Sequence, residues 1–352
     1  MLTVMKGWGQ RYFSNPQVVL LLILLAGGLV LVLSMGNVLA PVIASIVIAY
    51  LLQWIANFLI SCKIPRLAAM LVVYGAFLGI FLSAIFILWP IFWDQLLRLF
   101  EEFPSMVTSF QHYLYLLPEK FPEYLTKETI DGWVASFLTQ LKTSGKTLFA
   151  VSLSSLPSVL AVIVYLVLVP IMVFFFLKDY RKIIHWFAQY LPQDRQLLSV
   201  VGKEVHKQIG NYIRGKGAEV IIVGLSTYLV FYLCNMRYAT LLAVLVGISV
   251  LIPYIGAVVV TIPVILVAFF QWGFEQQFIY TLIAYGIVQT LDGAVLVPLL
   301  FSGAVNLHPL AIIVAILVFG GWWGFWGVFF AIPLAILIKA ILESWPHTAT
   351  AP

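Results

Sequence analysis

Residues 278–300, FIYTLIAYGIVQTLDGAVLVPLL, decide the fold class of this chain. The stretch is apolar and long enough to cross a bilayer as a helix, which takes about 20 residues. It nevertheless carries one carboxylate, Asp292. A carboxylate at bilayer depth costs about 2.5–3.5 kcal/mol on insertion scales, so it is usually paired, protonated or turned toward water. Asp292 is therefore the first candidate functional residue.

The whole chain shares this apolar character. Its 352 residues are 63% hydrophobic and 9% charged, with a mean hydropathy of +1.06, whereas soluble domains are about 45–50% apolar. The composition predicts an all-α polytopic membrane protein with about eight transmembrane helices. The candidate spans are the apolar runs 18–35, 38–60, 67–93, 151–177, 218–235, 240–270, 278–300 and 307–338.

Two of these runs are too long for one simple crossing, and both contain residues that break helices. The run 240–270 is interrupted by PYIG at 253–256, and the run 307–338 by GGWWGFWG at 320–327. Broken backbone at membrane depth is tolerated only where protein or a wet cavity satisfies its polar groups. We therefore expect broken or re-entrant segments in the C-terminal half, either at a substrate site, as in many transporters, or as plain kinks. The candidate site residues of the first break are Pro253, Tyr254 and Gly256.

Two segments are less apolar and predict amphipathic helices. In 94–150 acidic residues outnumber basic ones, and the prolines at 104, 118 and 122 predict breaks between short helices. In 178–217 basic residues outnumber acidic ones, and apolar residues recur with a period of four, as on one face of a helix. That stripe consists of Val201, Val205, Ile209 and Ile213.

The predicted organisation has five parts. They are three N-terminal spans in 1–93, an extracytoplasmic segment 94–150, a fourth span 151–177, a basic cytoplasmic segment 178–217 and a C-terminal membrane core 218–352. The first two runs are expected to form a helical hairpin through a tight turn at Gly36-Asn37.

The distribution of basic residues predicts the orientation. Because cytoplasmic loops carry the excess of Lys and Arg, the N-terminus and 178–217 are expected in the cytoplasm, and 94–150 outside. If 240–270 crosses the membrane once, the C-terminus is cytoplasmic as well. If 253–256 is the tip of a re-entrant hairpin, the C-terminus lies outside.

Most of the basic residues in 178–217 fit a membrane surface, where each contributes about 1 kcal/mol of attraction to anionic lipids. The candidates are Arg181, Lys182, Lys203, Lys207, Arg214 and Lys216. Glu219 is expected to pair with one of them at the interface. The run NYIRGKG at 211–217 lacks the GxxxxGK[ST] pattern of a phosphate-binding loop, so a nucleotide-driven pump is not predicted. Nor does the net charge of +5 predict nucleic-acid binding, because the basic residues flank apolar spans.

Three further polar or helix-breaking residues are candidates for a transport path. Gln289 lies three residues before Asp292, so the two side chains share one face of a helix. Pro298 follows Asp292 in the same run, and His308 precedes Pro309 at the start of the next one. His308 can titrate near neutral pH, or it can simply mark the beginning of a helix. Asp292 in turn can line a transport route or belong to a buried structural cluster.

The sequence offers little for catalysis or for a cofactor. Its two cysteines, Cys62 and Cys234, stand apart with no Cys/His cluster around them, so neither a metal site nor a disulfide framework is predicted. No Ser/His/Asp or HExxH arrangement stands out. We therefore expect a protein that is not an enzyme and needs no cofactor.

Several of the stretches quoted above resemble a known family. Residues 248–256 (ISVLIPYIG), 288–309 (VQTLDGAVLVPLLFSGAVNLHP) and 320–334 (GGWWGFWGVFFAIPL) are similar to C-terminal motifs of the autoinducer-2 exporter family. Earlier motifs that also resemble it are Pro41 with AYLL at 49–52, Pro170 with FFFLKD at 174–179, and YIRGK at 212–216. The likeness spans nearly the whole chain and is greatest to the PerM-like permease branch.

The resemblance implies a transporter of the bacterial inner membrane with about eight helices, no cofactor and a homo-oligomeric assembly, plausibly a pentamer. Some members of the family export autoinducer-2, and others exchange sodium or lithium for protons. Three hypotheses follow for this chain: export of a small polar metabolite such as autoinducer-2, monovalent cation/proton antiport, and a membrane scaffold that transports nothing. Asp292 would couple transport to protons or shape a polar site.

Overall fold

The computed structural model describes residues 16–120, 131–132, 135–136, 156–191, 196–301 and 307–344. Within these ranges every regular element is helical, which confirms the predicted all-α class. The α-helices are α2 (Pro16–Ser61), α3 (Arg66–Ser83), α4 (Trp89–Lys120), α6 (Leu156–Gln189), α7 (Gln196–Leu233), α8 (Ala239–Ser249), α9 (Ile255–Trp272), α10 (Gln276–Leu291), α11 (Val297–Phe301) and α12 (Pro309–Ser344). Two short π-helical segments join neighbouring helices, η1 (Ala84–Leu88) and η2 (Asp292–Leu296).

Six helical segments within the described residues are long and apolar enough to cross a membrane. They are Val38–Ser61, Arg66–Thr108, Leu198–Leu233, Ile255–Trp272, Gln276–Phe301 and Trp326–Glu343. Large apolar side chains cover much of their outer surface; Ile80 and Phe86, for example, are 71% and 72% exposed. Surfaces of this kind suit lipid rather than water, so the chain is a polytopic membrane protein.

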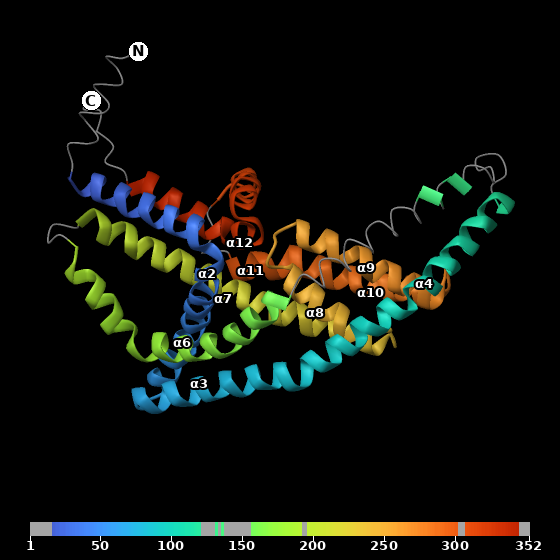
Figure 1. Ribbon diagram of the computed structural model, residues 1–352, viewed down its shortest axis with the longest axis horizontal. Helices are drawn as coiled ribbons and strands as arrows, with labels where there is room; N and C mark the ends of the chain where they lie inside the picture. The colour runs from blue at the N-terminus through green and yellow to red at the C-terminus, as the bar shows by residue number, and fades with distance from the viewer. Residues whose placement is uncertain are drawn as a thin grey trace, which may run out of the picture.

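The first helix is bent rather than folded into a hairpin. Met35 has φ −121° and ψ 19° inside α2, and helical backbone continues directly on both sides of it. Figure 1 shows α2 as one bent element. The break predicted at Gly36-Asn37 is therefore present one residue earlier, but as a kink inside one helix and not as the tight turn of a hairpin, because a single non-helical residue is enough to redirect the chain. The second half of α2 packs against α6 through Ala49, Leu52, Val173 and Leu177.

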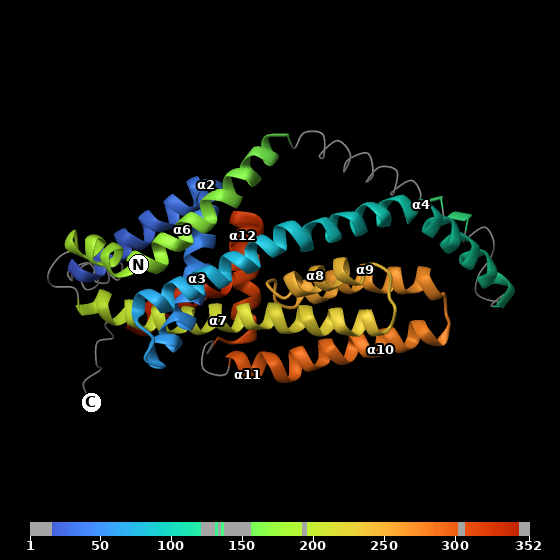
Figure 2. The same ribbon diagram turned by 90° about the horizontal axis from the view of Figure 1, so that it is seen from below.

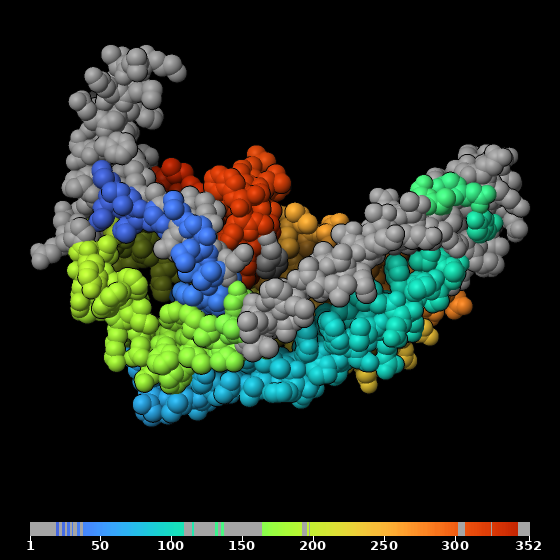
Figure 3. Space-filling model, viewed as in Figure 1, coloured from blue at the N-terminus to red at the C-terminus, as the bar shows by residue number. Residues whose placement is uncertain are grey.

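Helices α3 and α4 form one long rod through η1. Figure 3 shows this rod as a continuous band along one edge of the molecule, with the end of α4 extending from the body. The breaks predicted at Pro104 and Pro118 are absent, since α4 runs to Lys120; Pro122 lies outside the described residues. Met106 and Val107, just after Pro104, are both buried. We attribute the intact helix to this packing, which compensates for the lost backbone hydrogen bond.

Helix α7 is the axis around which the C-terminal half is built. It lies between α8–α9 on one side and α10–α11 on the other (Figure 2). Its residues Val223 and Phe231 share the largest apolar core with Leu242 of α8, Val264 of α9 and Tyr285 of α10. The stripe predicted in 178–217 lies on the first half of α7, after the break that separates α6 from α7.

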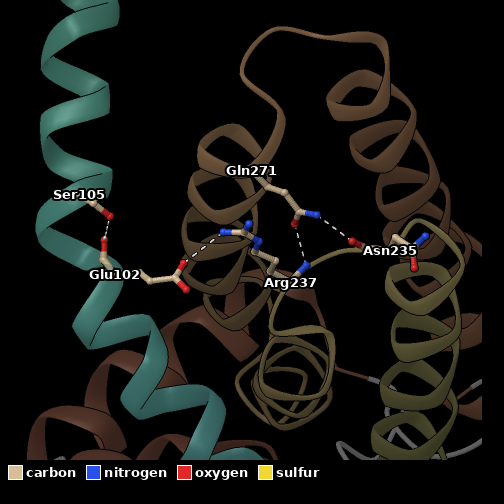
Figure 4. Close-up of polar contacts among 5 residues, drawn as sticks. All are labelled: Glu102, Ser105, Asn235, Arg237 and Gln271. Atoms are coloured by element: carbon tan, nitrogen blue, oxygen red, sulfur yellow. Dashed lines mark hydrogen bonds and ion pairs between the residues drawn. The ribbon is translucent and has the colours of Figure 1, made fainter.

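Helices α8 and α9 reverse the chain at the predicted break. The amide N–H of Arg237, just before α8, donates to Oε1 of Gln271 at the end of α9 over 2.7 Å, and Nε2 of Gln271 donates to the carbonyl of Asn235 over 2.8 Å. The start of α8 and the end of α9, which are the two ends of this hairpin away from its tip, therefore lie together, as Figure 4 shows. The tip at 250–254 lies at the opposite end of the hairpin.

Helix α4 holds this hairpin at its outer end. Oε1 of Gln95 accepts the N–H of Leu241 over 2.8 Å and so caps the first turn of α8. Glu102 pairs with Arg237 over 3.3 Å (Figure 4). These contacts join the rod formed by α3 and α4 to the loop between α7 and α8 and to the first turn of α8.

Helix α12 also reverses, at Gly324, whose φ of +58° is a left-handed conformation that glycine adopts readily. Its two arms pack on each other through Ala315, Ile316 and Ala331. At Gly327 a Cβ atom would lie 1.8 Å from the carbonyl oxygen of Phe319, so only glycine permits this approach. The glycine-rich block is therefore the turn of a second hairpin.

Candidate functional site

A cavity of about 370 Å³ lies where both hairpins meet α7 and α10. Pockets for small molecules typically measure about 300–1,000 Å³. Its polar lining consists of Tyr212, Lys216, Glu219, Tyr254, Gln289 and Asp292. The apolar lining includes Val250 and Pro253 from the first hairpin, Phe301 from α11, and Ile312 and Ile332 from the two arms of α12.

Asp292 owes its place to a local widening of its helix. It is the first residue of the π-helical segment η2, in which the N–H of Val297 donates to the carbonyl of Asp292. Pro298 follows directly and has no N–H to continue the normal ladder. The same order, a π-helical segment, one residue and then a proline, occurs at η1 before Pro90. Such widenings often accompany functional sites, and here Oδ1 of Asp292 is buried without a hydrogen-bond partner in the part of the chain that the structure describes.

A buried ion pair on α7 faces the same cavity. Nζ of Lys216 lies 3.0 Å from Oε1 and 2.8 Å from Oε2 of Glu219, whose side chain is 3% exposed. Lys216 also donates over 2.7 Å to the carbonyl of Val250, at the C-terminal end of α8, where the helix dipole favours a cation. Its ammonium lies 5.4 Å from the centre of the Phe301 ring. The pair therefore connects α7, the tip of the first hairpin and α11.

The tip of the first hairpin has a tight backbone. The N–H of Ile255 donates to the carbonyl of Pro253 over 2.7 Å, around Tyr254 with φ +63° and ψ −51°. This is a γ-turn with positive φ, a rare and strained conformation for a residue with a side chain. Gly256 follows, where a Cβ would lie 1.8 Å from the carbonyl oxygen of Ser249. Tyr254 itself is 62% exposed at the cavity.

The structure thus brings together four of the transport-path candidates: Asp292, Gln289, Pro253 and Tyr254. Gly256 lies buried behind them, and Pro298 is exposed beyond η2. His308 does not line the cavity; its Nδ1 accepts the N–H of Leu310 at the start of α12, over 3.2 Å. Among the described residues no group of three or more His, Cys, Asp or Glu side chains could hold a metal ion.

The basic candidates divide in a way that the sequence did not predict. Lys203 and Lys207 are exposed on the first half of α7. Lys182, also exposed, pairs with Asp179, while Nε of Arg181 donates to the hydroxyl of Tyr180. Arg214 is held by the carbonyl of Gly210 and by Oδ1 of Asn211.

Lys216 departs from the expected membrane surface, because its side chain is 11% exposed and turned into the cavity. Glu219, expected at the interface, lies there too. The sequence predicted that Glu219 pairs with a nearby basic residue, but not that the pair with Lys216 lies in the cavity. The available signal was their spacing of three residues within a helix, which places both side chains on one face.

Comparison with known proteins agrees with this architecture. Residues 19–347 match the family model described as AI-2E family transporter. The chain is 46% identical over 346 residues to the protein named "Putative permease PerM" of Escherichia coli strain K12, covering 98% of both chains. It is 27% identical to "Putative transport protein YueF" of Bacillus subtilis strain 168, over 80% of this chain and 77% of that one. It is 22% identical to "AI-2 transport protein TqsA" of Escherichia coli strain K12, over 92% and 91% respectively. The chain therefore belongs to the AI-2E family of membrane transporters, as its motifs predicted.

Proposed function

We propose that this protein moves a small polar solute across the bacterial inner membrane without nucleotide hydrolysis, and that the cavity around Asp292 is its solute site. The observation that carries the proposal is the position of Asp292. An acid within an apolar helix is a functional candidate by default, and this one adjoins a cavity between two reversed helical hairpins. Export of autoinducer-2 is the leading form of the proposal, supported by the likeness to a protein named for that transport.

Monovalent cation/proton antiport is the second candidate. Exchange of a proton for a cation needs carboxylates that bind either one, and many exchangers use two. The cavity provides Glu219 in addition to Asp292. Because Lys216 already pairs with Glu219, Asp292 is the group that would alternate between proton and cation. The homo-oligomeric assembly and the cytoplasmic N-terminus stay predictions.

Flux through the purified protein in liposomes tests both candidates. Autoinducer-2 uptake and sodium-dependent proton movement are measured for the wild type, Asp292→Asn and the control Asp94→Asn, which alters an exposed carboxylate on α4. We expect the Asp292 variant to lose most of the flux and the control to retain it. Wild-type flux in Asp292→Asn would contradict the assigned site. A wild type that moves neither autoinducer-2 nor cations would favour a scaffold.

A further inference from the structure

A directed chain of hydrogen bonds extends from the cavity between α10 and α9. The hydroxyl of Thr261 donates to the carbonyl of Ala257 over 2.7 Å, since a carbonyl can only accept. Its one proton is thereby used. The Tyr285 hydroxyl, 3.0 Å from Oγ1 of Thr261, must then be the donor of that contact. Tyr285 is 3% exposed, so this arrangement is shielded from water.

This chain fixes the orientation of the Gln289 amide. Nε2 of Gln289 lies 2.7 Å from the Tyr285 hydroxyl oxygen and donates to it. If the amide were turned over, two oxygens would face each other with no proton between them, because the tyrosine proton already points at Thr261. A buried contact between two unpaired acceptors costs about 1–3 kcal/mol. The amide therefore keeps its nitrogen, with one of its two N–H bonds, toward Tyr285, and its carbonyl oxygen is left as an acceptor for the cavity.

The charged side chains of the cavity carry a net negative charge, because the carboxylates of Glu219 and Asp292 outnumber the ammonium of Lys216. Lys216 donates to Oε1 of Glu219 and to the carbonyl of Val250, while Oε2 of Glu219, 2.8 Å from the same nitrogen, accepts no hydrogen bond from the described residues. Asp292 adds a carboxylate, one oxygen of which has no hydrogen-bond partner among the described residues. Among the described residues of the lining, the other polar side chains are Tyr212 and Tyr254, whose hydroxyls can donate or accept.

We infer that the cavity selects compact solutes that carry hydrogen-bond donors, as hydroxyls or as an ammonium group, and discriminates against anions. Tyr285 is the positioning residue that makes Gln289 an acceptor. The inference rests on the proposal that this cavity is the solute site. Its physical basis is the low dielectric of the site: an incoming donor satisfies Asp292 and Gln289, whereas an incoming carboxylate meets unpaired acceptors and a like charge.

Four probes of the full-length protein in lipid nanodiscs test this inference through the shift in unfolding temperature on ligand binding. Ethanolamine is a cation with donors, ribitol a neutral polyol, tetramethylammonium a cation without donors, and glycolate an anion. We expect ethanolamine, ribitol or both to stabilise the wild type, and the other two to have little effect. Comparing the first two probes shows whether the solute is cationic or neutral.

Variants then separate positioning from simple folding effects. In Tyr285→Phe the amide of Gln289 can rotate, so the preference for donor probes over glycolate should narrow by about five- to tenfold, the equivalent of one hydrogen bond. Gln289→Met should weaken the binding of the donor probes without strengthening the binding of glycolate. This variant tests the inference if Tyr285→Phe folds poorly. Thr290→Val, which alters an exposed hydroxyl beside Gln289, should keep the wild-type preference.

Three results would overturn the inference: equal stabilisation by glycolate and the donor probes, stabilisation by none of the four, or an unchanged preference in both Tyr285→Phe and Gln289→Met. The unfolding measurement detects binding, whereas the liposome assay detects flux. A negative result for the solute preference can therefore be distinguished from a negative result for the proposed transport.

Discussion

Replacement of Lys216 by methionine should destabilise the protein more than any other single neutralisation in the cavity. The substitution leaves Glu219, 3% exposed, without its partner. It also removes the cation whose charge acts on Asp292. Removing one partner of a buried ion pair costs about 3–5 kcal/mol, because the other charge remains buried. Little of this is offset by water, since the lysine side chain itself is 11% exposed.

Glu219→Gln should be the milder change. Lys216 then keeps the carbonyl of Val250 and the nearby charge of Asp292, so the expected loss is about 1–3 kcal/mol, that of a hydrogen bond to a charged group. In the double variant Lys216→Met with Glu219→Gln no unpaired Glu219 is left. It should therefore be more stable than Lys216→Met alone by about 1 kcal/mol or more, a typical coupling between contacting residues.

The free energy of unfolding, measured by SDS titration in mixed micelles, gives the order of the variants. Asp94→Asn, in an exposed pair, is the control and should change it by less than about 1 kcal/mol. The reasoning is refuted if Glu219→Gln is as destabilising as Lys216→Met, or if the double variant falls below both single ones. Either result would mean that Lys216 does not compensate the carboxylates of the cavity.

Three further outcomes follow from the fold. Gly256→Ala should lower stability by about 2–3 kcal/mol, because its Cβ would meet the backbone of Ser249, whereas Gly321→Ala, with open space around it, should be close to neutral in the same unfolding assay. Burial, and after it the Glu102 carboxylate, raises the pKa of Tyr238 to about 12. The stabilising contribution of Tyr238 is therefore complete below pH 10 and is lost as the pH rises toward 12. The thermal unfolding temperature should fall over this range in the wild type, and Tyr238→Phe should remove this dependence on pH. A reporter fused to the C-terminus should be active in the cytoplasm, and periplasmic activity would contradict the two reversals of the chain.

The sequence predicted the helices better than the connections between them. Apolar runs of sufficient length mark α7, α9 and α10 because burial in lipid demands them. Helix breaks are harder to predict. Pro104 lies within an intact helix because α4 packs on the core nearby, while the turn predicted at Gly36-Asn37 is only a kink at Met35 within α2. Tertiary packing decides such positions, and it is not written in the local residue pattern.

The sequence predicted the isolated carboxylate of the candidate site, but it did not predict that an ion pair lies beside it in the cavity. Asp292 and Gln289 stand out because polar groups are costly in an apolar run. Lys216 lies in a basic, amphipathic stretch and Glu219 lies just after it, so the pattern favoured a membrane surface. They enter the cavity because α7 is a single long helix whose middle faces the first hairpin and α11. The length of α7, rather than its composition, determines their place.

The two hairpins together determine on which side of the membrane residue 344 lies, and neither hairpin determines it alone. A re-entrant 240–270 by itself would place the C-terminus on the outer side. The contacts of Gln271 with residues 235 and 237 show that α8 and α9 return to the end from which they started. Residues 276–301 then cross back, because Phe301 packs on Tyr212 in the first half of α7. The reversal at Gly324 returns the chain a second time, with Ile332 and Ile336 packed beside Tyr212. Two reversals cancel, so residue 344 lies on the side of residue 196, the predicted cytoplasmic side.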